Sequence, residues 1–300
     1  MSICIIILNY NDSGTVERLV DSIIEYEMLN RIIIVDNCST DDSYVKLYTK
    51  YQGCDKVSVI LTDKNGGYGY GNNVGIKYAY YHLRADYILI TNPDVEFSNE
   101  LVKRLINALN SNERNAVASA LPITPEGNIQ FNAAWNIPSP LKYLLMTSSI
   151  VNRLMKPIYL NELDYKYSHQ VEVDCVAGSL LMVKADIMVN YGMYDESIFL
   201  YCEETVLGFK FKKAGYKTIL LTNIMYTHYH SVTINKSYQS EIKKRRLLHK
   251  SKIIVLKKYY ELSPLYIILS KVFLSLCLLE AMCKDLFKML QMRVLQQLKK

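Results

Sequence analysis

The chain has 300 residues, half of them apolar, and so can bury one substantial core with at most a smaller appendage. Its seven cysteines are scattered and lack the two-residue spacing of zinc or redox motifs, which predicts reduced thiols in a cytosolic protein. The net charge of +6 is uneven, because residues 241–300 carry +10 and the first 240 residues carry −4, so the tail is expected to meet an anionic partner.

Strand-like and helix-like segments alternate over the first 110 residues. The apolar run at residues 2–8 predicts a buried strand, since it has neither the basic flank nor the cleavage site of a signal peptide. A helix follows, with Asp12 and Ser13 as capping candidates. Further strands, each followed by a helix, are predicted at residues 31–35, 57–61 and 87–91. Such alternation predicts a parallel sheet with helices on both faces.

Polar and acidic residues follow the predicted strands, where ligands bind in sheets of this kind. Asp94, in Asn92-Pro93-Asp94, could hold a magnesium or manganese ion that bridges two phosphates. The same three residues are good turn formers, and spacing alone does not decide between the two roles. Asp36 could bind a nucleobase or ribose, or could serve only to cap a helix that starts at Ser39.

A loop at residues 65–75 contains five glycines between a predicted strand and a predicted helix. Such a loop lets the backbone approach a ligand closely and leaves amides free at the helix start. It contains no Walker sequence, and Asn72 stands where the dinucleotide fingerprint has its third glycine. These departures argue against ATP and nicotinamide as ligands.

Two acidic residues and two histidines lie further along the chain. Glu203 and Glu204 precede a helical stretch, where one of them could deprotonate a hydroxyl or both could simply complement the helix dipole. His228 and His230 alternate on a predicted strand, so at most one of them should face a metal, and a structural role is the alternative.

Taken in order, these stretches resemble the family 2 glycosyltransferases with the GT-A fold, in particular their rhamnosyltransferase-like branch. The resemblance runs from Ile5 to about Tyr260. Its motifs are Asn9-Tyr10-Asn11, residues 36–41, residues 65–75, and Asn92-Pro93-Asp94-Val95. Downstream, Gly178-Ser179 resembles the acceptor loop of the family, residues 199–215 resemble its acidic helix, and His228 resembles its late histidine.

The resemblance implies a mixed α/β fold with a mainly parallel sheet, and an inverting transfer from a UDP, dTDP or GDP sugar. The implied acceptor is a glycan or lipid-linked hydroxyl in polysaccharide biosynthesis of the cell envelope. Nucleotide-sugar contacts would come from Asn9, Asn11, Asp36, Asn65, Gly66, Gly67, Asn72, Asn92 and Asp94. Acceptor contacts would come from Asp174, Gly178 and Ser179.

The resemblance also implies a catalytic pair and a metal pair. Asp94 and His228 would hold a divalent cation, Mg²⁺ or Mn²⁺. Glu204 would be the general base, with Glu203 as the alternative. The family usually has aspartate at the base position, and the longer glutamate moves the basic oxygen by roughly 1.5 Å, which matters for catalytic geometry.

The tail is expected to form a separate helical extension, with a catalytic domain over residues 1–235 and the extension over 236–300. Basic clusters precede an apolar stretch at residues 265–279, whose fifteen residues fall short of the roughly 20 that span a bilayer. This pattern favours peripheral binding at the inner face of the cell membrane. Packing on the catalytic domain, or in a homodimer through the C-terminal helices, is the alternative. No nucleic-acid module accompanies the charge, so nucleic acid is not an expected partner.

Two other functions compete with sugar transfer. A non-catalytic protein that binds nucleotide sugars or glycans could use the same scaffold, because the acidic helix departs from the family pattern. A nucleotidyltransferase would be expected to have basic residues in a glycine-rich loop beside the first strand, and residues 9–14 do not fit that pattern.

Overall fold

A computed structural model describes residues 1–130, 132–160, 168–229 and 240–297, with the side chains of residues 286–290 and 292–297 left out. It contains two compact units. The sheet unit comprises Met1–Ile137 and Ile158–Ser237, and the helical unit comprises Pro138–Pro157 and Tyr238–Lys300. The domain boundary expected between residues 235 and 236 lies outside the described residues.

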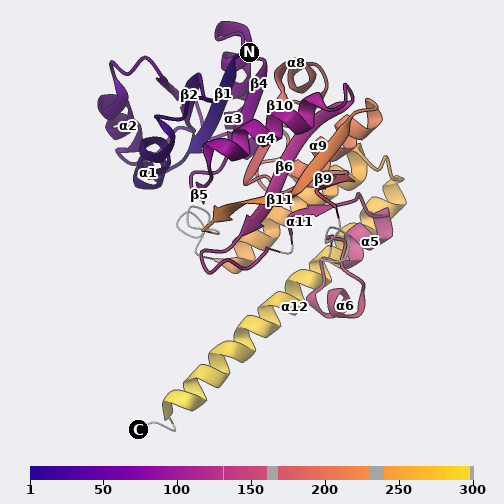
Figure 1. Cartoon of the computed structure of the whole chain (residues 1–300). Helices are drawn as coiled ribbons and strands as arrows, with labels where there is room; N and C mark the ends of the chain where they lie inside the picture. The colour runs from indigo at the N-terminus through magenta and orange to yellow at the C-terminus, as the bar shows by residue number, and fades with distance from the viewer. Residues whose placement is uncertain (131, 161–167, 230–239, 298–300) are drawn as a thin grey trace. The chain divides into compact units, whose positions relative to one another are not determined.

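The sheet unit is built on nine strands in the order β3-β2-β1-β4-β10-β6-β11-β5, with β8 paired to β11 (Figure 1). Six strands run parallel: β1 (Ile3–Asn9), β2 (Arg31–Asp36), β3 (Val57–Leu61), β4 (Tyr87–Thr91), β6 (Asn115–Ile123) and β11 (Lys217–His228). Three run against them: β5 (Val95–Glu96), β8 (Gln170–Val173) and β10 (Leu180–Lys184). A separate ribbon pairs β7 (Ala134–Trp135) with β9 (Cys175–Val176). The expected mainly parallel α/β fold is confirmed.

Helices cover both faces of the sheet, which is why the central strands are apolar on both sides. On one face, α1 (Ser13–Ile23), α2 (Ser43–Tyr51) and α4 (Asn99–Asn110) pack against alternate strand residues such as Ile5 and Ile32. On the other face, α3 (Tyr68–Lys77) packs against β1 and β2, and α9 (Glu203–Lys213) packs against β9 and β11. The chain also has a short α8 (Ala185–Ile187) and π-helical turns at Tyr78–His82 and Met188–Gly192.

The helix starts agree only in part with the sequence predictions. Ser98 caps α4, because its hydroxyl accepts a hydrogen bond from the Leu101 N–H at 3.2 Å. The helix predicted to start at Ser39 begins instead at Ser43, since both the N–H and the hydroxyl of Ser39 donate to Asp36. Asp12 stands at the cap of α1, but its carboxylate accepts from the Thr15 hydroxyl at 3.0 Å rather than from a backbone N–H.

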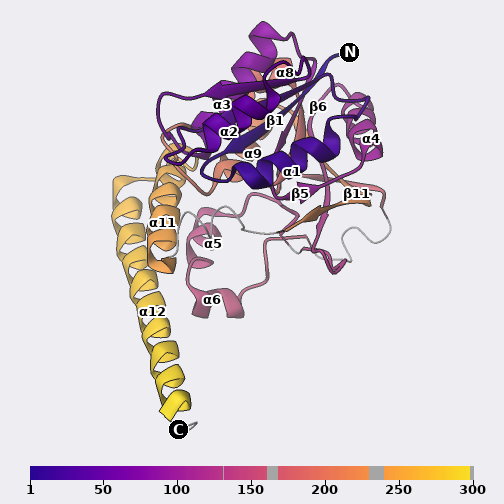
Figure 2. The same cartoon turned by 90° about the vertical axis from the view of Figure 1, so that its left-hand side faces the viewer.

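The helical unit contains α5 (Pro140–Leu145), α6 (Ser149–Leu154), α11 (Glu241–Lys258) and α12 (Pro264–Gln297), and α11 and α12 run side by side (Figure 2). Glu280 of α12 binds the start of α6, accepting from the Ser148 and Ser149 hydroxyls at 2.7 Å each. Lys252 of α11 donates to the Tyr143 carbonyl of α5 at 2.8 Å. The helical extension was expected. No helix was predicted at residues 140–154.

The apolar part of α12 is longer than the sequence analysis suggested. By length and composition, Pro264–Asp285 forms a helix of 22 residues that could cross a membrane. The fifteen-residue estimate was too short because Ala281, Met282 and Cys283 continue the apolar run past Glu280.

Candidate functional site

Asp36 lies at the end of β2, directly beside Asn9 at the end of β1. The carboxylate is fully buried, and Oδ2 accepts from Asn9 Nδ2 at 2.6 Å and from the Ser39 hydroxyl at 2.8 Å. Its Oδ1 accepts from the Ser39 N–H at 2.8 Å. Asn11, in a left-handed conformation with φ of 54°, closes the loop by binding Thr40 through its amide. Asp36 is therefore held rigidly at the sheet edge where a nucleotide is expected.

The glycine loop is fixed between β2 and the segment that precedes α9. Asn37 donates from Nδ2 to Asn65 Oδ1 at 3.1 Å and to the Gly67 carbonyl at 3.0 Å. Gly67 has a φ of 91°, and an added Cβ there would overlap the Phe199 carbonyl, so glycine is required. Gly66 packs its backbone against the Tyr70 ring.

Two predicted nucleotide-sugar contacts carry a buried oxygen without a hydrogen-bond partner among the described residues. These atoms are Asn9 Oδ1 and Asn72 Oδ1. Buried polar groups are nearly always satisfied, so such atoms are typical of sites that a ligand or water completes. A ligand or water at this sheet edge would complete both amides.

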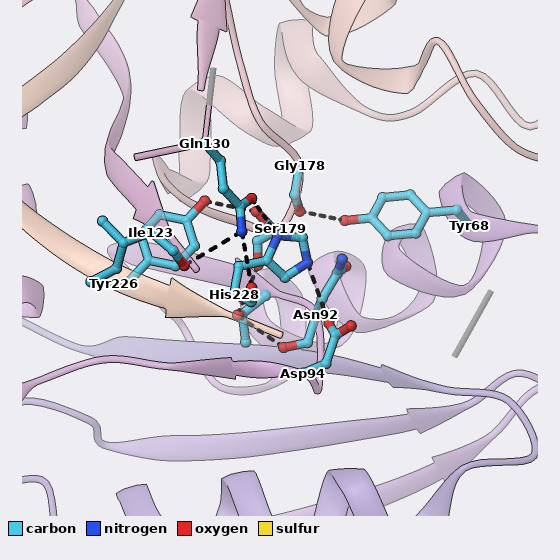
Figure 3. A network of polar contacts seen from close by, with 10 residues as sticks. Tyr68, Asn92, Asp94, Ile123, Gln130, Gly178, Ser179, Tyr226 and His228 are labelled. Carbon is cyan, nitrogen blue, oxygen red and sulfur yellow. Dashed lines mark hydrogen bonds and ion pairs between the residues drawn. The ribbon is translucent and has the colours of Figure 1, made fainter. Parts of the chain in front are cut away.

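Asp94 and His228 lie next to each other because β5 pairs antiparallel with the end of β11 (Figure 3). His228 is the register partner of Val95, and the Tyr229 N–H donates to the Asp94 carbonyl at 2.9 Å. Asp94 Oδ1 lies 3.6 Å from His228 Nε2, and both side chains are at least 90% buried. His230 lies outside the described residues.

This pair fits a divalent cation by spacing and by chemistry. Ligands about 2.1 Å from one ion lie roughly 3–4 Å from each other, which matches the 3.6 Å between Asp94 and His228. No cluster of three or more His, Cys, Asp or Glu ligands occurs in the part of the chain that the structure describes. The remaining coordination positions would therefore fall to oxygens of a ligand or of water.

Gly178 and Ser179 lie against the end of β4, as the antiparallel pairing of β10 with β4 requires. The Ser179 carbonyl accepts from the Asn92 N–H at 2.9 Å and from the Thr91 hydroxyl at 3.0 Å. The Ser179 hydroxyl bonds to the Tyr226 hydroxyl at 2.7 Å (Figure 3). Gly178 and Ser179, two of the predicted acceptor residues, thus lie beside Asn92, which precedes Asp94 by two positions.

Glu204, at the start of α9, lies against Gly178. An added Cβ at Gly178 would overlap Glu204 Oε1, and the Gly178 N–H hydrogen-bonds to the Glu204 carboxylate. The carbonyl of Gly178, in the next peptide group, accepts from the Tyr68 hydroxyl at 3.0 Å (Figure 3). Tyr201 and Cys202, both left-handed with φ of 72° and 73°, turn the chain sharply just before this helix. The glycine loop, the 178–179 segment and the acidic pair are therefore contiguous.

The two glutamates differ in their protonation. Burial and the neighbouring Glu204 carboxylate raise the pKa of Glu203 to about 8. Burial also raises the pKa of Glu204, but hydrogen bonds from its own N–H and from the Gly178 N–H oppose that rise. Near neutral pH, Glu203 therefore holds a proton, and Glu204 is the carboxyl of the pair whose ionised form receives hydrogen bonds from two backbone N–H groups.

The Asp174 carboxylate makes its contacts away from the start of α9. Its Oδ2 accepts from the Ile137 N–H at 2.9 Å and from Lys212 Nζ at 2.8 Å. Lys212 is eight positions along α9 from Glu204, which corresponds to about 12 Å of helix. The contacts of Asp174 thus join α9 to the β7 end, and its predicted acceptor role stays a prediction.

The strand order brings the other predicted residues to one edge. Strands β2 and β4 flank β1, so their carboxyl ends lie only about 10 Å apart. Three contacting residues lack a predicted role: Tyr68, Asn37 and Gln130. Tyr68 and Asn37 stand inside the motifs, so their position was a usable signal. Gln130 stands in a segment without periodicity, so the sequence offered no signal for this residue.

Comparison with known proteins identifies the family of the chain. The family model described as glycosyl transferase family 2 matches residues 4–181. The hexosyltransferase Agl10 of low-salt glycan biosynthesis in Haloferax volcanii is 27% identical over 202 residues, 67% of this chain. The chain spans only 58% of the length of that relative.

Two rhamnosyltransferases are covered more completely. WbbL of Escherichia coli K12 is 26% identical over 75% of this chain and 82% of its own length. The N-acetylglucosaminyl-diphospho-decaprenol L-rhamnosyltransferase of Mycobacterium tuberculosis is 22% identical over 84% of this chain and 83% of its own length.

Solved structures show the same fold at low identity. GalNAc-T7 with UDP, GalNAc and Mn²⁺ superposes with a TM-score of 0.60 at 16% identity, over 77% of this chain and 44% of that one. The mannosyltransferase PcManGT of Pyrobaculum calidifontis with GDP-Man and Mn²⁺ gives 0.57 at 13% identity, over 94% and 73%. The family model covers more than half of the chain, and the chain belongs to glycosyl transferase family 2.

Proposed function

We propose that this protein is an inverting glycosyltransferase that moves a sugar from a nucleotide diphosphate to a hydroxyl of a glycan or lipid-linked acceptor. The observation that carries the proposal is the Asp94–His228 pair, 3.6 Å apart at the sheet edge that also holds Asp36. Glu204, whose carboxylate form receives backbone hydrogen bonds beside a protonated Glu203, takes the acceptor proton. The hydroxyl oxygen then bonds to the anomeric carbon as the bond to the nucleotide diphosphate breaks, which inverts the configuration.

A divalent cation, Mg²⁺ or Mn²⁺, is proposed as the cofactor, held by Asp94 and His228 on the donor diphosphate. Such a cation supplies electrostatic stabilisation of the leaving diphosphate. Two similar structures are named with Mn²⁺ beside UDP or GDP-mannose, which supports a metal-bound nucleotide donor in this fold. The relatives named as rhamnosyl- and hexosyltransferases support a six-carbon sugar and an acceptor in glycan biosynthesis.

Nucleotide binding tests the proposal most directly. We expect one of UDP, dTDP and GDP to raise the melting temperature of the intact protein when Mn²⁺ is present and much less when EDTA is present, because the proposed cation would strengthen binding of the diphosphate. Differential scanning fluorimetry with the three nucleotides and their matched monophosphates measures this. Equal shifts with and without metal, or none with any nucleotide, contradict the proposed donor site. Binding without transfer to any acceptor supports the non-catalytic alternative.

The helical unit is proposed to bind the inner face of the cell membrane peripherally. One face of α12 carries exposed apolar side chains at helical spacing: Leu265, Ile268, Leu269, Val272, Leu276 and Leu279, each more than half exposed. One face of α11 carries exposed cations at spacings of three, four and seven residues: Lys243, Arg246, Lys250 and Lys257. An apolar face together with a basic face is the pattern of helices that lie on anionic lipid.

Sedimentation with vesicles distinguishes membrane binding from homodimer formation through the C-terminal helices. The wild type is expected to sediment with phosphatidylglycerol vesicles at low salt and to be released at high salt. The variant Ile268→Gln/Val272→Gln/Leu276→Gln is expected not to sediment with the vesicles. Val45→Gln/Leu61→Gln, at exposed apolar positions of the sheet unit, is the matched control and should bind like wild type. If the wild type binds no vesicles and is a dimer in analytical ultracentrifugation, while the triple variant is a monomer, the homodimer is supported instead.

A further inference from the structure

The geometry points to Gln130 as a positioning residue that holds His228 in the tautomer able to bind a metal, an inference that rests on the proposed metal site. Gln130 follows β6, in a short return of the chain in which its N–H donates to the Pro122 carbonyl at 2.8 Å. The residue is 7% exposed, so its amide is removed from water and must be satisfied by protein groups.

The orientation of the Gln130 amide follows from its two backbone neighbours. Gln130 Nε2 donates to the His228 carbonyl at 2.9 Å and to the Ile123 carbonyl at 3.4 Å (Figure 3). Rotating the amide by half a turn would place its oxygen against two carbonyl oxygens, an arrangement in which three acceptors face each other. The amide oxygen is therefore fixed on the other side, 3.3 Å from His228 Nδ1.

A fixed acceptor beside Nδ1 determines which ring nitrogen carries the proton. An amide oxygen only accepts hydrogen bonds, so Nδ1 must donate and in the neutral ring Nε2 presents its lone pair. That lone pair faces Asp94 Oδ1 at 3.6 Å. Two acceptors at this separation attract a cation between them, and histidine ligands are generally oriented by such a partner on the second nitrogen. Gln130 thus prepares the site for a metal.

The tautomer can be observed without any metal or activity. In uniformly ¹⁵N-labelled wild-type protein at about pH 8.5, long-range ¹H–¹⁵N spectra should show His228 with a protonated Nδ1 and an unprotonated Nε2. His228→Gln identifies the signal among the five histidines. A His228 ring protonated at Nε2, or at both nitrogens, overturns the inference even if nucleotide binding is as proposed.

Two substitutions separate positioning from simple structural support. Gln130→Leu removes the acceptor for Nδ1, and Mn²⁺ affinity measured by electron paramagnetic resonance should fall roughly 10- to 100-fold. Gln130→Glu also loses the amide donors and turns one carboxylate oxygen toward the two carbonyls, but its other oxygen remains an acceptor for Nδ1, so its Mn²⁺ affinity should fall clearly less than that of Gln130→Leu. A role confined to supporting the two backbone carbonyls predicts equal losses in both variants.

The controls keep this inference distinct from the proposed function. If wild-type protein binds Mn²⁺ and nucleotide but Gln130→Leu binds Mn²⁺ equally well, the positioning role is wrong and the metal site stands. If wild-type protein binds no Mn²⁺ at all, the proposed metal site fails whatever the tautomer. Should Gln130→Leu not fold, the wild-type spectrum and the Gln130→Glu affinity still decide.

Discussion

Asp94→Ala is expected to abolish metal-dependent donor binding and to reduce sugar transfer at least roughly 10³-fold. Asp94 supplies the negative charge of the pair with His228, and the two side chains are buried together at 3.6 Å. Removing the carboxylate leaves a single imidazole, which is too weak a site for Mg²⁺ or Mn²⁺, since both prefer oxygen ligands. Isothermal titration of Mn²⁺ with the preferred nucleotide, and initial rates of transfer, measure the two effects.

The same strand provides the control for Asp94. Asp86 stands just before the other end of β4, where its carboxylate accepts from the Ser2 N–H at 2.6 Å. Asp86→Ala removes an acid from the opposite edge of the sheet and should leave Mn²⁺ and nucleotide affinity unchanged. An Asp94→Ala enzyme that keeps its metal-dependent binding would remove Asp94 from the site and the proposed donor chemistry with it.

Glu204→Gln is expected to lower transfer roughly 10²- to 10⁴-fold while nucleotide binding persists. Glutamine keeps the size of the side chain and can still accept from the Gly178 N–H, but it cannot take a proton. The comparison of turnover with nucleotide affinity therefore isolates base catalysis from donor binding. Collapse of both quantities would indicate a structural role for Glu204.

Glu203→Gln is the matched substitution at the adjacent residue. Glutamine imitates the protonated acid that Glu203 already is near neutral pH, because its pKa is raised to about 8. Turnover at pH 7 should therefore remain within a few-fold of wild type. The wild-type rate should rise with pH through the raised pKa of Glu204, since only the ionised carboxylate accepts a proton. If Glu203→Gln lost turnover and Glu204→Gln kept it, the base would be Glu203.

The fold was predictable because apolar runs and polar ends alternate regularly. The strands β3 and β4 begin and end where the sequence analysis placed them, at residues 57–61 and 87–91. The helices α5 and α6 were missed because residues 138–157 show no clear period and their partners are distant in sequence, as in the hydrogen bond that the Ser148 hydroxyl donates to Glu280, 132 residues away. Long-range packing of this kind leaves no local signal.

The residues of the candidate site that stand in sequence motifs were predictable, and the residues placed only by packing were not. The strand order places Asp36 and Asp94 at neighbouring strand ends, as a parallel sheet requires. Asp174 was chosen by resemblance alone, and its bond to Lys212 depends on the packing of α9. Ser39 illustrates a local competition: its side chain satisfies Asp36 and so cannot begin a helix.

The bond from Tyr68 to the Gly178 carbonyl has a mechanical consequence for the order of events. Tyr68 begins α3 within the glycine loop, and the Gly178 N–H holds the Glu204 carboxylate. Gly178 therefore links the glycine loop to the proposed base through two successive peptide groups that meet at its Cα. On the proposed roles, a displaced glycine loop would shift Glu204 as well, which would tie deprotonation of the incoming hydroxyl to a well-seated nucleotide.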